Sequence, residues 1–594
     1  MSMRINFACA VLGAWAMTAC AGTVSVKVVA LNDFHGNMQS PGSFKANATA
    51  PSVPSGGADV LAAYVSQLKA QNPNNAIVAA GDLIGASPLI SALFHDEPTI
   101  EAMNRIGLEF NAVGNHEFDE GKTELKRMQS GGCHPTDPNS CKGASVGTPV
   151  PFEGAKFKFL AANVFDTTTN ATVFPPYAIK SFGTVRVAFI GMTLQATPTI
   201  VTPSGVAGLR FDDEAATVNA LVPKLRARGV EAIVVLLHQG GFQTTPPSPV
   251  DINGCAGEMA GTDVADIVGK LDNAVDLVIS GHTHSAYNCK LPNATGRKIP
   301  VTSANAFGRV LTDIDLTLDT TSGDVVDVVA VNRVVDRSAP GITPVAGIKT
   351  LVDNYNTLVS PIANQVIGSI TADVLNTKNA ACSMPAGELV ADAQWKATQP
   401  TGFGGAQVAF MNPGGVRNPG FVLSQISGSE AAGDVTYGEA FTVQPFGNSL
   451  VTMTLTTQQI KDMLEQEFTG CMGQTANRVL LPSTGFSMSW DATAAACQKV
   501  VDVKLAGETL VAGGVVQNPA KTYRVTVNNF LSTGGDGFTV LTGGTSLLGG
   551  AQDIDALVDY MAGFKTPNPP YNPADPLLAK PRISRIDAGA SCPP

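Results

Sequence analysis

Five short apolar runs in the first half of the chain each end on polar residues that can bind a metal ion. The runs are residues 24–31, residues 76–80, the stretch that ends at Val113, residues 232–237 and residues 274–279. The polar residues that follow them are Asp33, His35, Asp82, Asn115, His116, His238, His282 and His284. Because sites in α/β proteins lie beyond the carboxyl ends of buried strands, the pattern predicts that these side chains gather on one rim.

The distribution of histidine favours a functional role for this rim. The chain has 7 histidines, and all except His95 and His134 follow these apolar runs. A single histidine after a strand is usually a packing residue, and the hexapeptide 114–119 alone is compatible with an ordinary polar turn. Five histidines placed in this way are poorly explained by packing alone, so the pattern indicates a site.

The residue types indicate divalent metal ions. Imidazole, carboxylate and amide ligands together suit zinc, manganese, iron or cobalt, and the sequence does not choose among these metals. Two ions can be held if one carboxylate bridges them, and Asp82 is the expected bridge because it stands alone after its strand. The predicted ligands are Asp33, His35, Asp82, Asn115, His238, His282 and His284. Two ions so placed would polarise a phosphoryl group and lower the pKa of a bound water.

Length and charge limit the classes of function. A chain of 594 residues predicts roughly two to four domains. The apolar fraction of 44% supports large buried cores, and the charged fraction of 15% argues against extensive disorder. The net charge of -11 argues against a protein that binds nucleic-acid polymers. A small anionic substrate would need a local cationic centre, which bound metal supplies.

The N-terminus is typical of an export signal. Arg4 precedes the apolar stretch Ile5–Met17, and residues 18–21 are small enough for cleavage, which predicts a signal peptide over residues 1–21. Cleavage after Ala21 competes with lipidation at Cys20, because residues 17–20 loosely resemble a bacterial lipoprotein box. We therefore expect a periplasmic or secreted protein, attached to a membrane only if Cys20 carries a lipid.

The cysteines predict disulfides. Cys9 and Cys20 fall in the export segment or at its end, and the remaining cysteines are Cys133, Cys141, Cys255, Cys289, Cys382, Cys471, Cys497 and Cys592. An even number behind a signal peptide is typical of disulfides, and none of these residues forms a C-x-x-C zinc pair. Proximity in the sequence favours the pairs Cys133–Cys141 and Cys255–Cys289. The pairing of the other four stays open.

The chain is expected to divide into two α/β parts joined by a helix. Residues 311–318 and 324–332 alternate in polarity and predict an antiparallel edge of the first domain. A helix is predicted over residues 343–359, with apolar residues at helical spacing. Other predicted helices cover residues 58–70, 98–106, 387–397 and 457–468. The expected parts are residues 22–340, a linker helix over 341–361, and an α+β domain over 362–594.

The metal motifs resemble those of a known family. Asn32–Gly36, Gly81-Asp82, Gly114–Asp119, His238 and Gly281–His284 look like the motifs of calcineurin-like metallophosphoesterases, and specifically of the 5'-nucleotidase and UDP-sugar hydrolase group. The resemblance implies a four-layer α/β sandwich for the first domain. It places one ion on Asp33, His35, Asp82 and His284, and the other on Asp82, Asn115, His238 and His282. It makes His116 and Asp119 a catalytic dyad, in which His116 stabilises the transition state or protonates the leaving oxygen.

The second half also resembles this group. The segments 412–417, 444–448 and 529–538 match loops that bind the substrate in the family. The resemblance implies that Asn412 and Arg417 contact the substrate, with the Arg417 fork on its phosphate. It further implies that Phe446 and Phe530 enclose a nucleobase and that Asp536 holds the ribose. The alternative for both phenylalanines is a place in the core.

Two departures from the family pattern bear on the substrate. Pro413 replaces a glycine of the family loop, and residues 382–389 lack an arginine that many relatives carry there. We therefore expect one phosphate contact fewer than in such relatives, whereas the metal motifs are complete.

We expect a two-metal phosphomonoesterase that acts on nucleotides, with closure of the two domains bringing the substrate to the metals. UDP-sugars, 2',3'-cyclic nucleotides or a sulfur-linked substrate at the same metals are alternatives. A non-catalytic nucleotide-binding surface protein is an alternative from another class, although an intact His116 and Asp119 argues against it. The oligomeric state is not indicated by the sequence.

Overall fold

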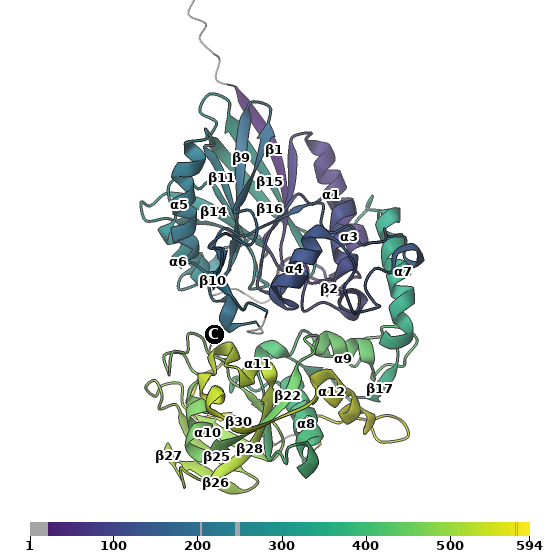
Figure 1. Cartoon of the computed structure of the whole chain (residues 1–594), viewed down its shortest axis with the longest axis vertical. Helices are drawn as coiled ribbons and strands as arrows, with labels where there is room; N and C mark the ends of the chain where they lie inside the picture. The colour runs from purple at the N-terminus through teal and green to yellow at the C-terminus, as the bar shows by residue number, and fades with distance from the viewer. Residues whose placement is uncertain (1–21, 202–204, 244–249, 576–577, 579, 594) are drawn as a thin grey trace, which may run out of the picture.

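The computed structural model describes residues 22–201, 205–243, 250–575, 578 and 580–593. The predicted signal peptide and Cys20 lie outside these residues. The chain forms two lobes, and helix α7 (Ala346–Ala363) runs along one side of the molecule from the first lobe to the second (Figure 1). Among the described residues, no helix combines the length and the apolar character needed to cross a membrane.

The first lobe is built on two six-stranded sheets. The first sheet contains β1 (Thr23–Leu31), β4 (Asn75–Ala79), β5 (Phe110–Ala112), β6 (Lys158–Leu160), β15 (Val310–Asp319) and β16 (Val325–Val334). The second contains β8 (Tyr177–Phe182), β9 (Val185–Thr193), β11 (Ala232–His238), β12 (Leu277–Ser280), β13 (Ala286–Pro292) and β14 (Lys298–Ala304). Their strand orders are β16-β15-β1-β4-β5-β6 and β13-β14-β12-β11-β9-β8.

The two sheets lie face to face, and helices cover both outer faces. Alternate side chains of β1 belong to different layers of the core, because successive residues of a strand point to opposite faces of the sheet. Val28 belongs to the core between the sheets, together with Val234 of β11. Val29 instead packs toward the helices α1 (Ala58–Gln71) and α3 (Glu97–Ile106). Helices α5 (Glu214–Arg226) and α6 (Asp263–Lys270) cover the second sheet, which gives the expected four-layer α/β sandwich.

The five apolar runs are strands, but they divide between the two sheets. β1, β4 and β5 are parallel neighbours in the first sheet, and β11 and β12 are parallel neighbours in the second. Both groups end at the side of the first lobe that faces the second lobe. The rim predicted from the sequence is therefore shared by two packed sheets, an arrangement that the local apolar pattern does not encode.

The predicted antiparallel edge is confirmed. β15 pairs antiparallel with β1 on one side and with β16 on the other, so β16 forms the edge of the first sheet. The bridging helix begins and ends slightly later than predicted, at Ala346 and Ala363, with Pro361 in its last turn.

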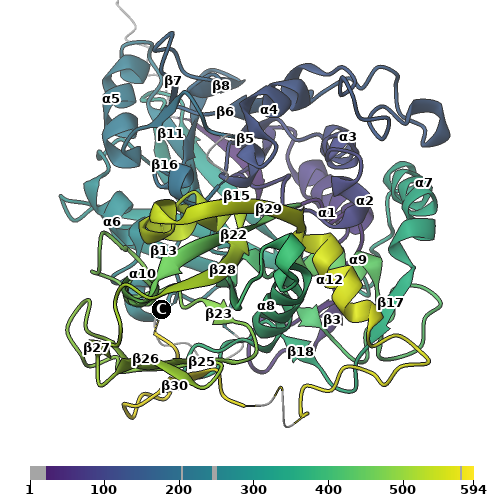
Figure 2. The same ribbon diagram turned by 60° about the horizontal axis from the view of Figure 1, so that its bottom comes forward.

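The second lobe contains two smaller five-stranded sheets. One contains β19 (Val408–Met411), β22 (Ser449–Thr456), β23 (Leu481–Pro482), β28 (Thr522–Asn528) and β29 (Thr545–Gln552), in the order β23-β19-β28-β22-β29. The other contains β24 (Phe486–Trp490), β25 (Val500–Leu505), β26 (Glu508–Ala512), β27 (Val515–Val516) and β30 (Ile583–Arg585), in the order β27-β26-β25-β24-β30. Figure 2 shows both sheets from the underside of the molecule.

Within the described residues, the second lobe contains five longer or shorter α-helices. They are α8 (Pro385–Thr398), α9 (Tyr437–Val443), α10 (Thr457–Glu465), α11 (Asn529–Ser532) and α12 (Asp553–Ala562). Three of them, α9, α10 and α11, begin at a residue whose side chain caps the helix. Thr436 and Glu439 form a capping box before α9, and Thr456 and Gln459 form another before α10. The α10 helix ends at Glu465, three residues before the predicted end.

Four disulfides are present among the described residues. The predicted pairs Cys133–Cys141 and Cys255–Cys289 are confirmed. The pairs left open by the sequence are Cys471–Cys497, which are 26 residues apart, and Cys382–Cys592, which are 210 residues apart. The last bridge ties the segment before α8 to the C-terminal tail.

Candidate metal centre and substrate cleft

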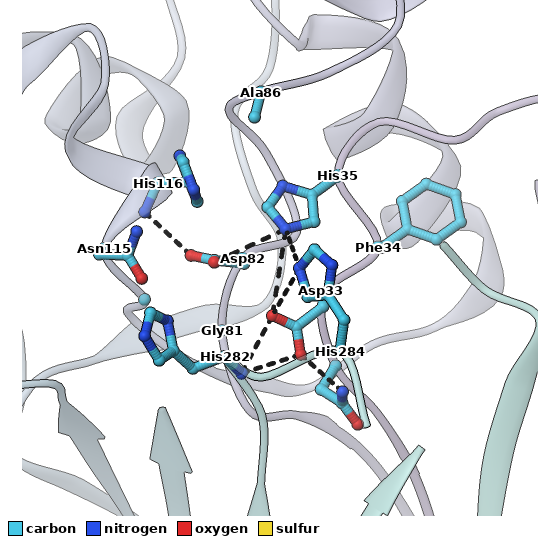
Figure 3. A network of polar contacts seen from close by, with 12 residues as sticks. Asp33, Phe34, His35, Gly81, Asp82, Ala86, Asn115, His116, His282 and His284 are labelled. Carbon is cyan, nitrogen blue, oxygen red and sulfur yellow. Dashed lines mark hydrogen bonds and ion pairs between the residues drawn. The ribbon is translucent and has the colours of Figure 1, made fainter. Parts of the chain in front are cut away.

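The ends of β1 and β12 supply a first group of metal-binding side chains. Asp33, His35 and His284 present ligand atoms that all lie within 4.8 Å of one another (Figure 3). His35 Nε2 is 3.0 Å from His284 Nε2, and His284 Nε2 is 3.6 Å from Asp33 Oδ1. His35 Nδ1 donates to the carbonyl oxygen of Gly85 at 2.8 Å, which leaves Nε2 with its lone pair toward the group.

The ends of β4, β11 and β12 supply a second group, made of Asp82, His238 and His282. His238 Nε2 lies 3.0 Å from Asp82 Oδ2 and 3.1 Å from the side-chain oxygen of Asn115. His238 Nδ1 donates to the carbonyl oxygen of Ala80 at 2.7 Å, so its Nε2 also faces inward. All seven predicted ligands are therefore brought together, although they come from two sheets.

The residues present fit two divalent ions. Asp82 Oδ2 lies between the two groups, 3.6 Å from His35 Nε2 and 3.0 Å from His238 Nε2, yet it accepts no well-aligned hydrogen bond among the described residues. A buried carboxylate oxygen without such a bond is costly unless a cation compensates it. The close approach of His35 Nε2 and His284 Nε2, 3.0 Å apart, points to the same conclusion.

Burial sets the protonation of the ligands. It lowers the pKa of His35 to about 3 and that of His282 to about 3, so both rings are neutral near pH 7 and can bind a metal. Burial also opposes charge on His238, but Asp82 beside it raises the pKa of His238 above its usual value. The field at the second group thus favours positive charge.

Close packing and backbone strain hold the loops that carry the ligands. Asp33, His35, Asp82, His282 and His284 have φ values of 49°, 45°, 51°, 71° and 54°, in a region that residues with a side chain rarely adopt. Such strain is common at functional sites, where the surrounding structure maintains it. Two glycines permit the approach of the loops, because a Cβ on Gly114 would collide with Asp82 Oδ1 and one on Gly81 with His238 Nδ1.

Glu117 connects two of these loops, a role that sequence reasoning missed. It is buried and accepts from the backbone N–H groups of Asp82 and Leu83 at 2.9 Å each. It also accepts from the N–H of Gly114 at 2.6 Å and from the side chain of Asn111 at 3.2 Å. One carboxylate therefore fixes the turn after β4 against the turn after β5. Its position inside the motif 114–119 was the only available signal.

His116 and Asp119 lie together beside the metal ligands. His116 Nδ1 is 2.9 Å from Asp119 Oδ2, which also accepts from the N–H of Ala86 at 3.1 Å. Burial opposes charge on His116, but Asp119 and Asp82 raise its pKa above the usual value, which favours the protonated ring. The N–H of His116 also donates to Asp82 Oδ1 at 2.9 Å.

A cavity of about 230 Å³ separates the dyad from the second lobe. Its walls include Asn115, His116, Asp119 and His282 from the first half of the chain. All five substrate-binding residues predicted from the sequence also line it, namely Asn412, Arg417, Phe446, Phe530 and Asp536. Ile200, Val201, Arg478 and Asn528 line it as well and were not predicted, and Asn448 of the segment 444–448 also lines it.

The predicted recognition residues differ in their surroundings. The Phe446 ring stacks on His116, with centroids 5.8 Å apart, and the Arg417 guanidinium lies 5.7 Å from the centre of the same ring. Phe530 is 9% exposed, packs in the core of the second lobe and also lines the cavity. Asp536 accepts from Asn412 Nδ2 at 2.8 Å. Its charge is partly balanced by Arg478, whose Nε lies 3.5 Å from Oδ1.

Comparisons with known proteins agree with this geometry. Residues 26–286 match the family model for calcineurin-like phosphoesterases, and residues 366–543 match that for the 5'-nucleotidase C-terminal domain. A cell wall protein of Listeria monocytogenes is 31% identical over 568 residues, which cover 92% of this chain and 68% of that protein. The chain is also 31% identical to an endonuclease of Bacillus subtilis, of which it spans 40%.

A solved structure shows the same two-lobed arrangement. The 5'-nucleotidase precursor from Thermus thermophilus has a TM-score of 0.73 and 25% sequence identity, with 95% of this chain and 100% of that chain covered. The fold and site therefore define a metal-dependent phosphoester hydrolase of the calcineurin-like class. Within this class, the chain belongs to the 5'-nucleotidase family, which combines the metallophosphoesterase domain with the 5'-nucleotidase C-terminal domain.

Proposed function

We propose that this protein hydrolyses phosphate monoesters of nucleotides outside the cytoplasm, with two divalent ions and a dyad of His116 and Asp119. One observation carries the proposal: the dyad and two of the predicted metal ligands, Asn115 and His282, line the same cavity as Arg417. The residues of the predicted metal centre and dyad therefore meet an anion-binding residue in one cavity, although the former lie in the first half of the chain and the latter in the second.

The first ion would be held by Asp33, His35, Asp82 and His284, and the second by Asp82, Asn115, His238 and His282. Zinc, manganese, cobalt and iron all suit this set of nitrogen and oxygen ligands. When bound, the ions would polarise the phosphoryl group and supply a nucleophile of lowered pKa.

His116 is placed to act on the leaving group. Asp119 accepts the Nδ1 proton of His116 and so fixes the orientation of the ring. The raised pKa of His116 keeps a proton available at Nε2, which would pass to the oxygen of the departing nucleoside.

The second lobe would recognise the rest of the nucleotide. Arg417 has no ion-pair partner among the described residues, and burial lowers its pKa, so an anionic ligand would compensate a cation that the protein leaves unpaired. The rings of Phe446 and Phe530, which both line the cavity, offer apolar surfaces for a base. Asn412 orients Asp536, whose remaining acceptor sites suit ribose hydroxyls.

We further propose that residues 22–340 and 362–594 move relative to each other about the segment 341–361. The cavity between them is small, and the substrate must enter between two lobes that are joined on one side by α7. Closure would bring the phosphate on Arg417 to the metals, and opening would release product. Export of the protein to the periplasm or beyond is supported by the four disulfides.

A substrate panel tests the proposal. Purified protein would be assayed for phosphate release from nucleoside monophosphates, a UDP-sugar, a 2',3'-cyclic nucleotide and an aryl phosphate, before and after treatment with a chelator. We expect the highest kcat/KM for a nucleoside monophosphate, loss of activity with chelator, and recovery on addition of a divalent metal. Preference for the UDP-sugar or the cyclic nucleotide would reassign the substrate, and absence of all turnover in metal-loaded protein would contradict the function.

A further inference from the structure

Two arginine side chains of the second lobe reach the cavity that faces the metal centre. Arg417 and Arg478 both line it, together with His116 and His282 of the first lobe. Arg417 follows the loop whose resemblance to the family implies a phosphate contact. Arg478 lies in the segment between α10 and β23, and neither the motifs nor the family resemblance gives it a role.

The segment that carries Arg478 is held firmly. The N–H of Arg478 donates to the carbonyl oxygen of Glu467 at 2.7 Å, and its Nη1 donates to Gln474 Oε1 at 3.2 Å and to the carbonyl oxygen of Asp536 at 3.1 Å. The disulfide Cys471–Cys497 fixes the start of the segment. An arginine held in advance loses little conformational freedom when it binds a ligand.

One edge of the Arg478 guanidinium remains free. Nε lies 3.5 Å from Asp536 Oδ1, and within the described residues no hydrogen-bond partner is found for Nη2. The side chain is 24% exposed and borders the cavity. Asp536 already accepts from Asn412, so Arg478 is not its only polar partner. The free edge therefore offers donors to an anion.

The segment in which many relatives carry a second arginine has none in this chain. Cys382 stands before α8 and forms a disulfide with Cys592 of the C-terminal tail, and Pro385 begins the helix. Residues 382–389 contain no arginine. A second cation in the cleft must therefore come from another element, and Arg478 supplies one at the same cavity.

We propose that Arg478 is a second anion-binding residue of the cleft, which together with Arg417 contacts the phosphoryl group of the substrate. This inference rests on the proposed phosphoesterase function and identifies a contact that the family motifs do not. The competing explanation is that Arg478 only positions Asp536. The two explanations differ in which product of hydrolysis loses affinity when Arg478 is changed.

The affinities of metal-loaded protein for the two products distinguish the two explanations. Isothermal titration calorimetry would measure the affinity for orthophosphate and for adenosine in wild type, Arg478→Met, Arg478→Lys and Asp536→Asn. We expect Arg478→Met to weaken orthophosphate by about tenfold or more, as for loss of a charge-assisted hydrogen bond, and adenosine by less than about twofold. Arg478→Lys should recover part of the loss, because it keeps the charge but not the planar fork.

Asp536→Asn should show the opposite pattern, with a lower affinity for adenosine and an unchanged affinity for orthophosphate. Arg210→Met is the matched control, because Arg210 pairs with Asp212 on the surface and does not line the cavity. An Arg478→Met variant with normal orthophosphate affinity would overturn the proposal, whether or not adenosine weakens. If that variant fails to fold, judged by its unfolding midpoint, full orthophosphate affinity in folded Arg478→Gln would overturn it equally.

The result is independent of the preferred substrate. Orthophosphate binding needs no turnover, so the inference can fail while nucleotide hydrolysis is observed. Conversely, a wild-type protein that hydrolyses no nucleotide would contradict the proposed function, whereas the role of Arg478 would still be decided by the affinity for orthophosphate.

Discussion

The two walls of the cleft are built in different ways. On the first-lobe wall, the predicted ligands follow strand ends, and most are buried, with Asp33, His35 and His238 at 0% exposure and Asp82 at 1%, while His282 and His284 are partly exposed. On the second-lobe wall, Arg417 and Arg478 lie in irregular segments and are only partly buried. The rings of His35 and His238 are each oriented by a backbone carbonyl, whereas the Arg417 guanidinium lies beside the Phe446 ring.

This difference determines which wall tolerates substitution of its residues. A metal ligand cannot be moved without disturbing strained loops and close glycine contacts around it. A cation on the opposite wall can be supplied from any element that borders the cavity. The chain accordingly keeps a complete metal set while it lacks the arginine expected at residues 382–389.

Removal of Asp82 should have the largest effect. Asp82→Ala takes away the carboxylate placed between the two ligand groups, so we expect loss of both ions and of all detectable turnover. Metal content by inductively coupled plasma mass spectrometry, together with activity, checks this. Asp353→Ala, which removes only a surface pair with Lys349, is the control. Full metal content in Asp82→Ala would show that Asp82 is not the bridge.

Removal of the dyad histidine should spare metal binding. His116→Ala should keep both ions and a nearly normal KM, yet lose kcat by about 10²–10⁴-fold, the usual contribution of acid–base catalysis. His134→Ala is a matched control, because His134 stacks on His95 outside the cavity of about 230 Å³. Loss of metal in His116→Ala would instead identify His116 as a ligand.

Glu117→Gln should reduce stability more than it affects recognition. The amide would place an N–H₂ group against backbone donors that now share a carboxylate, which should cost about 1–3 kcal/mol in the free energy of unfolding. Denaturant unfolding measures this cost, with Glu153→Gln as a surface control. A stability equal to wild type would mean that Glu117 does not hold the two turns together.

Much of the first wall could be predicted from the sequence. The strands before Asp33, Asp82 and His238 have the continuous apolar character of buried parallel strands, and their polar ends follow directly. The division of these strands between two sheets was not predictable, because strand pairing joins segments that are far apart in the chain. The role of Glu117 was hidden for the same reason, since its partners come from two separate turns.

Less of the second wall could be predicted without the family resemblance. Arg478 follows no apolar run and belongs to no recognised motif, so nothing local marks it. β29 was not predicted either, because its sequence is rich in glycine and all its residues are exposed. The bridge Cys382–Cys592 joins residues 210 positions apart, beyond the reach of an argument from proximity.

The first-lobe wall is proposed to carry the chemistry and the second-lobe wall to recognise the base, and steady-state kinetics on two substrates distinguishes these roles. Phe446→Ala and Phe530→Ala would be assayed with a nucleoside monophosphate and with a simple aryl phosphate that has no base. We predict a loss in kcat/KM equivalent to about 1–3 kcal/mol for the nucleotide, the usual worth of stacking on a base, and little change for the aryl phosphate. Equal losses on both substrates would contradict the account, because these rings would then be packing residues and the second wall would not recognise the base.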